Sequence, residues 1–214
     1  MKPLAARRKQ PRRLKETAVD YQVTMRTLAA TPENKVWTYD DYLGLPDDQQ
    51  YQIIEGELFL APAPYSDHQR VSRELEFLLL THVKKHALGE VFYAPFDVII
   101  DERNVVQPDI LFIDKSRLGY IRKRGLFGRP DLAMEIVSPS TTQLDRRKKL
   151  ALYERCGVPE YWVIDPANRT IEIFLLTEGR YQPLAFAAET GSVKSHLLPG
   201  FEVDLAAIMP APAE

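Results

Sequence analysis

The amino-acid sequence predicts a mixed α/β (α+β) domain in which helices flank a central mixed β-sheet. The first observation is the order of the patterns, because helical segments at 66–89 and 141–157 alternate with groups of short strand-like runs. The second is composition: the 214 residues are 45% hydrophobic and 27% charged, which suits one globular domain. We expect a single domain over 31–209, with a basic, flexible arm at 1–30 and a flexible tail at 210–214.

The first elements are a short helix and a hairpin. Thr38 with Asp41 forms a capping pattern, and Pro46 ends the short helix. The run YQIIEGELFL (51–60) is typical of a hairpin that turns at Glu55-Gly56, where glycine supplies the positive φ of a tight turn.

The longest predicted helix covers 66–89. Ser66 and Gln69 match a capping box, and Gly89 is expected to end the helix. Its apolar residues recur at helical spacing: Val71, Leu75, Leu78, Leu79 and Val83.

The second half combines strands with one further helix. VFYAPFDVII, VVQPDILFI and DLAMEIVS are strand-like runs, and a helix at 141–157 opens at Thr142 with Asp145 and closes at Gly157. EYWVID, TIEIFLL and YQPLAF follow as late strands, with turns at 166–169 and 178–179. No dinucleotide-binding or P-loop glycine pattern occurs, so we expect no nucleotide cofactor.

Charge is distributed unevenly. Residues 1–26 hold eight of the 28 Lys and Arg but two of the 30 acids, which leaves 20 basic and 28 acidic residues for the rest. A basic arm either binds nucleic acid phosphates or is simply solvated, and an acidic body argues against DNA binding over the whole surface. No apolar run approaches the roughly 20 residues of a membrane span, and none follows the basic N-terminus, so a cytoplasmic protein is expected. The lone Cys156 suits a small core residue.

Two acids occupy unusual positions in predicted strands. Glu135 lies within DLAMEIVS and shares a strand face with Ala133 and Val137, where an ionised carboxylate needs a partner. Asp109 follows Pro108, which places it at a strand start or edge. Two converging carboxylates suit Mg²⁺ or Mn²⁺, whereas the alternative is an ordinary salt bridge from each acid to an arginine.

A lysine of the second helix is the expected partner. At about 100° per residue, Lys149 falls on one stripe with Asp145, Leu152, Tyr153 and Cys156, so its ammonium should point inward towards Asp109 and Glu135. Lys148 lies beside Arg155 on another side of the helix. Asp145 is better explained as part of the Thr142 cap than as a catalytic residue.

Two further groups of residues are candidate binding sites. His82 and His86 are four residues apart but lack the intervening glutamate of a zincin motif, and are interpreted as helix-face residues. The acid-free segment 115–130 interleaves Tyr120 and Phe127 with basic residues, and either contacts nucleic acid beside the acidic site or is a solvated loop. Its six basic residues are Lys115, Arg117, Arg122, Lys123, Arg124 and Arg129.

These residues resemble the Uma2 group of restriction-endonuclease-like proteins, within the PD-(D/E)XK nuclease superfamily. The resemblance spans most of 36–200 and rests on VVQPDILFI, on DLAMEIVSPSTTQLDRRKKLALYERCGVPEYWVIDP and, more weakly, on YQIIEGEL with the following His68. It implies a restriction-endonuclease-like core, Asp109 and Glu135 as metal ligands, and hydrolysis of phosphodiester bonds. Val137 stands where the superfamily usually has its lysine, and Lys149 matches members in which that lysine has moved to the next helix. Similarity also suggests Glu57 as a further metal-site acid and His68 as a neighbour.

The resulting hypothesis is a Mg²⁺- or Mn²⁺-dependent DNA endonuclease with Asp109, Glu135 and Lys149 as its catalytic residues. The alternative from another class is a catalytically inactive nuclease-like module that binds DNA or serves in assembly. A third hypothesis keeps the fold and the metal but takes RNA as the substrate. A homodimer is expected by analogy only.

Overall fold

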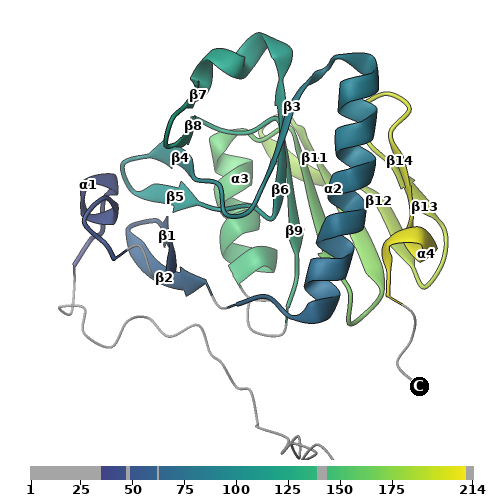
Figure 1. Ribbon diagram of the computed structural model, residues 1–214, viewed down its shortest axis with the longest axis horizontal. Coiled ribbons are helices and arrows are strands. Elements are labelled where there is room, and N and C mark those ends of the chain that lie inside the picture. The colour runs from purple at the N-terminus through teal and green to yellow at the C-terminus, as the bar shows by residue number, and fades with distance from the viewer. Residues whose placement is uncertain (1–34, 47–48, 62, 139–143, 211–214) are drawn as a thin grey trace, which may run out of the picture.

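The described strands divide between two six-stranded sheets and a two-stranded ribbon, in a mixed α/β arrangement (Figure 1). The computed structural model describes residues 35–46, 49–61, 63–138 and 144–210. The predicted basic arm and residues 211–214 of the predicted tail lie outside them. The fold class is confirmed, but the prediction of one central sheet is refined, because the strands of the first half form a second sheet of their own.

The main sheet is mixed. Strands β9 and β10 run parallel, while every other neighbouring pair in this sheet is antiparallel. Its order is β12 (Arg180–Ala188), β11 (Thr170–Thr177), β10 (Glu160–Asp165), β9 (Leu132–Ile136), β6 (Ile110–Asp114) and β3 (Gly89–Tyr93). The parallel pair requires a crossover, which is supplied by the π-helical turn η2 (Leu144–Lys149) and the helix α3 (Leu150–Cys156).

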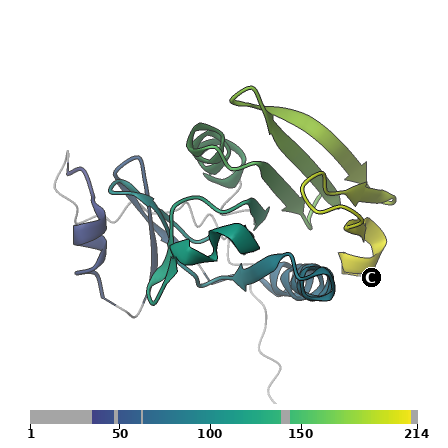
Figure 2. The ribbon, with the colours of Figure 1, turned by 90° about the horizontal axis from the view of Figure 1, so that it is seen from above.

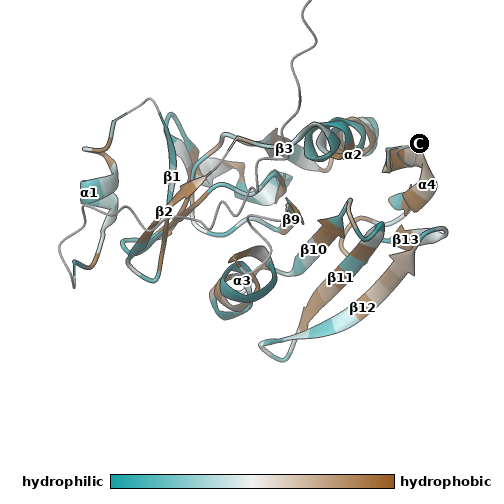
Figure 3. Ribbon diagram, turned by 90° about the horizontal axis from the view of Figure 1, so that it is seen from below, coloured by the Kyte–Doolittle hydropathy of each residue, from teal (hydrophilic) through white to brown (hydrophobic). Residues whose placement is uncertain are grey.

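The two long helical elements cover opposite faces of the main sheet (Figures 1 and 3). Helix α2 (Ser66–His86) packs its stripe of Val71, Leu75, Leu79 and Val83 in one cluster with Met134 and Trp162 of the sheet. Helix α3 packs in another cluster with the alternate residues of the same strands, including Ala133 and Val163. The period-2 alternation of strand side chains therefore decides which helix each residue meets.

The second sheet forms a separate layer, shown in purple to teal in Figure 2. Its order is β2 (Glu57–Ala61), β1 (Gln50–Ile54), β5 (Asn104–Val106), β4 (Val98–Asp101), β8 (Gly125–Phe127) and β7 (Ile121–Arg122). The predicted hairpin is confirmed as β1–β2, and its turn residues Glu55 and Gly56 both have positive φ. Helix α1 (Tyr39–Tyr42) begins at the predicted capping box of Thr38 and Asp41.

The remaining elements complete the edges of the molecule. A 3₁₀ helix, η1 (Lys115–Tyr120), follows β6, and the ribbon of β13 (Ser192–Lys194) and β14 (Glu202–Asp204) precedes α4 (Leu205–Ile208). The late strands and the turns at Arg169 and at Glu178-Gly179 are as the sequence predicts. No helix in the described ranges has the length and apolar content needed to cross a bilayer.

The predicted ends of the long helix were wrong in detail. The predicted cap residue Ser66 already lies inside the first turn. The N-cap is Tyr65, whose side chain makes no capping hydrogen bond. At the other end Ala87 adopts the left-handed conformation, and Gly89 instead begins β3. A Cβ at Gly89 would lie 2.0 Å from the carbonyl oxygen of Ile113, so this glycine permits the close approach of β3 to β6.

The second predicted helix is shorter than expected. It ends at Gly157, as predicted, but its first turns form η2 rather than regular α-helix. The predicted cap residue Thr142 and the side chain of Asp145 lie outside the described part of the chain.

Candidate functional site

Asp109 and Glu135 lie at the same end of two neighbouring strands. Strands β6 and β9 pair Ile110 with Met134 and Leu111 with Ala133, and continuing this antiparallel register sets Asp109 opposite Glu135. Side chains directly opposite each other project from the same face of a sheet. The two acids that the sequence singled out are therefore brought together by strand register.

Glu135 is buried together with a cation. Its side chain is 2% exposed, and its Oε2 accepts a hydrogen bond of 2.7 Å from Nζ of Lys149, which is 3% exposed. Its Oε1 accepts a second bond, of 2.9 Å, from the hydroxyl of the buried Tyr153. A buried ion pair persists only when each charge is matched and the remaining hydrogen-bonding positions are used, and both conditions hold for this carboxylate. Lys149 thus points inward, as its position on the helical stripe predicts.

Asp109 is the more accessible acid. Its Oδ2 accepts a hydrogen bond of 2.7 Å from the backbone N–H of Ile136, and its Oδ1 lies 3.2 Å from Nε2 of His68. The Asp109 side chain is 18% exposed, so it reaches solvent where Glu135 does not. His68 comes from the first turn of α2, and the structure brings it to the site as the sequence similarity suggests.

One cavity of about 610 Å³ is lined by Asp109, Glu135, Lys149 and His68. It lies where the first turns of α2, the hairpin β1–β2, the adjoining ends of β6 and β9, and η2 come together. Six polar residues of its wall matter for the chemistry: Asp109, Glu135, Lys149, His68, Gln52 and Gln107.

Gln107 is a wall residue that the sequence reasoning missed. Its backbone N–H donates to Oε1 of Gln52 (3.2 Å), and its side-chain Nε2 donates to Oδ1 of Asp97 (2.8 Å) and to the hydroxyl of Tyr42 (3.3 Å). Burial, and next to it the hydrogen bond to Asp97, raises the pKa of Tyr42, which keeps this hydroxyl protonated. The amide is therefore oriented by its nitrogen, and its Oε1 is a buried acceptor with no partner among the described residues.

A local signal for these missed residues exists. Gln107 stands two residues before Asp109 in VVQPD, the spacing of one strand face, and Tyr153 falls on the same helical stripe as Lys149. What each side chain binds depends on segments distant in the sequence, so the pattern alone did not assign a role to either.

The donor set fits a hard divalent cation. Two carboxylates line the same cavity as Gln107, whose amide oxygen has no partner among the described residues, and Mg²⁺ commonly binds through one or two carboxylates while it keeps several waters. Among the described residues no group of three or more His, Cys, Asp and Glu side chains is placed to hold a metal ion of any kind.

Glu57 is not brought to the two strand acids. Its side chain is 58% exposed and forms an ion pair with Lys148, while Arg155 pairs with Glu55 of the same hairpin turn. Lys148 and Arg155 therefore tie the solvent-facing side of η2 and α3 to the hairpin β1–β2. Lys148 therefore points away from Lys149, on the side of Arg155, as the sequence predicts.

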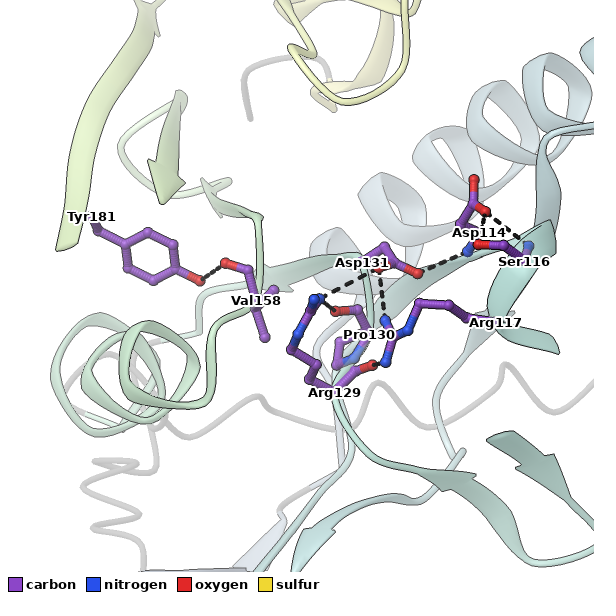
Figure 4. A network of polar contacts seen from close by, with 8 residues as sticks. All are labelled: Asp114, Ser116, Arg117, Arg129, Pro130, Asp131, Val158 and Tyr181. Carbon is purple, nitrogen blue, oxygen red and sulfur yellow. Dashed lines mark hydrogen bonds and ion pairs between the residues drawn. The ribbon is translucent and has the colours of Figure 1, made fainter. Parts of the chain in front are cut away.

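The basic segment 115–130 does not lie where it was expected. It leaves the main sheet after Asp114 and returns at Asp131, the ends of β6 and β9 opposite to Asp109 and Glu135, about 14–17 Å away along the strands. Arg117 and Arg129 pair with Asp131, whose Oδ2 also accepts the backbone N–H of Asp114 (Figure 4). The basic residues Arg122, Lys123 and Arg124 are exposed on the β7–β8 hairpin. The prediction that this segment lies beside the acids is wrong, because none of its residues lines the cavity.

His82, His86 and Cys156 take structural positions. The rings of His82 and His86 lie 4.6 Å apart on α2, and burial, together with His86 and Lys85, lowers the pKa of His82. Cys156 is half-buried against the cluster beneath α3, and burial raises the pKa of its thiol. This supports the interpretation of Cys156 as a core residue.

Comparisons with known proteins place this geometry in context. The family model described as "Uma2: Putative restriction endonuclease" matches residues 39–206. A similar solved structure is that of a putative nuclease belonging to DUF820 from Anabaena variabilis, with a TM-score of 0.67 and 20% sequence identity. The likeness covers 80% of this chain and 96% of the Anabaena chain, and at that identity it supports the fold alone. No curated protein matches the chain.

Proposed function

Because the chain belongs to the Uma2 family of putative restriction endonucleases, we propose that it is a divalent-metal-dependent endonuclease that hydrolyses DNA phosphodiester bonds. The observation that carries the proposal is the buried Glu135–Lys149 pair, set beside Asp109 on the wall of one cavity. A carboxylate and an ammonium buried to this extent are costly for a fold, and an active site is one place where such groups are used.

The side chains would share the chemistry as follows. Asp109 and Glu135 would hold Mg²⁺ or Mn²⁺, and a bound cation of this kind neutralises phosphate charge and makes water a better nucleophile. Lys149 contributes a fixed positive charge, oriented by its hydrogen bond to Glu135, for the negative charge that develops on the phosphate. Tyr153 and the backbone of Ile136 hold the two carboxylates in place, which spares the site the cost of ordering them during the reaction.

His68 has a role that the geometry allows beside Asp109. Its Nε2 lies 3.2 Å from Oδ1, so the imidazole orients that carboxylate oxygen. His68 is therefore a positioning residue in this scheme.

Plasmid nicking tests the proposal. The wild-type protein should nick supercoiled DNA with Mg²⁺ or Mn²⁺ and stop when EDTA is added. Asp109→Asn and Lys149→Met should each lower the rate by at least about 100-fold, the range found when an electrostatic group of an active site is removed. Glu90→Gln, which changes an exposed acid of β3 outside the cavity, is the matched control. Undiminished nicking by Asp109→Asn would refute the assignment.

A specific observation favours a second candidate, a nuclease-like module without catalysis that binds DNA. Both oxygens of Glu135 already accept hydrogen bonds, one of them from the ammonium of Lys149, so the charge of Glu135 is matched without a metal ion. This candidate predicts no heat on titration of Mg²⁺ into the protein and an affinity for DNA that EDTA leaves unchanged. Cleavage of matched DNA and RNA substrates would decide between the two nucleic acids, and sedimentation would test the proposed homodimer.

A further inference from the structure

We propose that Arg70, Arg73 and Tyr93, at the rim of the cavity, bind a single-stranded stretch of nucleic acid next to the scissile phosphate. This inference rests on the proposed nuclease function and names the form of the substrate. It also moves the nucleic-acid contact from the basic segment 115–130 to the first two turns of α2 and the end of β3.

The two arginines are available to phosphate groups. Arg70 and Arg73 lie on the cavity wall three residues apart on α2, and their side chains are 58% and 72% exposed. Each pairs with an acid of its own helix, Arg70 with Asp67 and Arg73 with Glu74. Exposed pairs of this kind contribute little and are readily exchanged, so a phosphate can replace either carboxylate.

Tyr93 supplies an exposed aromatic surface on the same rim. It is 55% exposed at the end of the edge strand β3, and it lines the cavity together with Arg73 and Asp109. An aromatic ring left open at the mouth of a polar cavity is a surface on which a base can stack, whatever its identity.

A single strand fits this rim better than a duplex. In a duplex the faces of the bases are covered by their neighbours, so Tyr93 could stack only on a base that is unpaired or turned out. Gln50 and Gln69, both exposed, also line the cavity and add amide groups that can bond to base edges, and the cavity is large enough for a nucleotide. Glu76 also lines this part of the cavity, and burial raises its pKa.

The basic segment offers an internal comparison. Arg117 and Arg129 are bound to Asp131, and the exposed Arg122 lies over the ring of Phe127, with its Cζ 5.5 Å from the ring centroid. Tyr120 is 52% exposed, much like Tyr93. Both of these surfaces combine basic and aromatic residues, but one borders the cavity of Asp109 and Glu135 and the other does not.

Fluorescence anisotropy of the full-length protein with a labelled oligothymidine, in EDTA to prevent cleavage, tests the proposal. Tyr93→Leu should weaken binding about tenfold, the loss expected for one base stack, and should change the affinity for a blunt duplex by less than about twofold. Arg70→Gln with Arg73→Gln should lower the slope of log affinity against log salt by about 1.4, since each lost phosphate contact on a single strand removes about 0.7. Tyr120→Leu and Arg122→Gln with Arg124→Gln are the matched controls and should bind like the wild type.

The outcomes separate this inference from the proposed function. Loss of binding in the Tyr120 and Arg122/Arg124 variants, with full binding by the rim variants, would overturn it. If Tyr93→Leu lost affinity equally for the oligothymidine and for the duplex, the inference would also be overturned. A change in the sedimentation of Tyr93→Leu without a change in its DNA affinity would overturn it too, because that result would identify the rim as a protein interface. Binding that depends on the rim in a protein that nicks no DNA would uphold the rim site while refuting catalysis.

Discussion

The two ends of the β6–β9 strand pair carry the same kinds of residues and use them differently. At one end Asp109 and Glu135 face Lys149 and His68 on the wall of a cavity. At the other end Asp114 and Asp131 face turn backbone and two arginines.

The difference lies in what the carboxylates bind. Asp131 accepts hydrogen bonds from Arg117 and from the backbone of Asp114, and Asp114 caps η1 through the N–H of Ser116 (Figure 4). These acids close a loop and have no place on the cavity wall. Asp109 keeps a partly exposed side chain beside a buried, matched charge pair. The adjoining cavity is therefore what distinguishes the acids at one end of this strand pair from those at the other.

The largest expected effect concerns the buried pair. Lys149→Met leaves the carboxylate of Glu135 buried without its cation, and removing one partner of a buried pair costs about 3–5 kcal/mol. We expect a loss of this size in the free energy of unfolding, measured by urea denaturation at pH 7. The double variant Glu135→Leu/Lys149→Met should recover most of it, because no charge is left buried. A single variant as stable as the wild type would contradict the burial argument.

An intermediate effect is expected at the opposite end. Asp131→Asn keeps an oxygen that can accept the N–H of Asp114 but loses the charge that binds Arg117, which should cost about 1.5–3 kcal/mol of unfolding free energy. Nicking by the folded protein should stay within about twofold of wild type, since Asp131 is remote from the cavity. A large loss of nicking with little loss of stability would show that the comparison of the two ends is wrong.

The smallest effect is a dependence on pH. Hydrogen bonds from the side chain and backbone of Ser116 lower the pKa of Asp114 below its ordinary value of 3.8. A carboxyl group whose pKa is lower in the folded state stabilises the protein above its unfolded-state pKa and loses this contribution as pH falls through the folded value. Urea denaturation between pH 5 and pH 2.5 should show a slightly steeper acid loss for wild type than for Asp114→Asn. Parallel curves would exclude a contribution from this cap.

Properties that depend on one element were predictable from the sequence. The turn at Glu55-Gly56, the strand face of Glu135 and the inward direction of Lys149 follow from local backbone preference and from the periods of strand and helix. Even the partnership of Glu135 with Lys149 could be proposed, because one buried charge requires another of opposite sign.

Properties that depend on several elements were decided by the tertiary structure. The division into two sheets and the hydrogen bond from Gln107 to Tyr42 join segments that are distant in the sequence. The basic segment is adjacent to both acidic strands along the chain, yet antiparallel pairing places it at their far ends. Periodicity determines which side of its own strand or helix a residue occupies, whereas strand register and packing determine what it meets there.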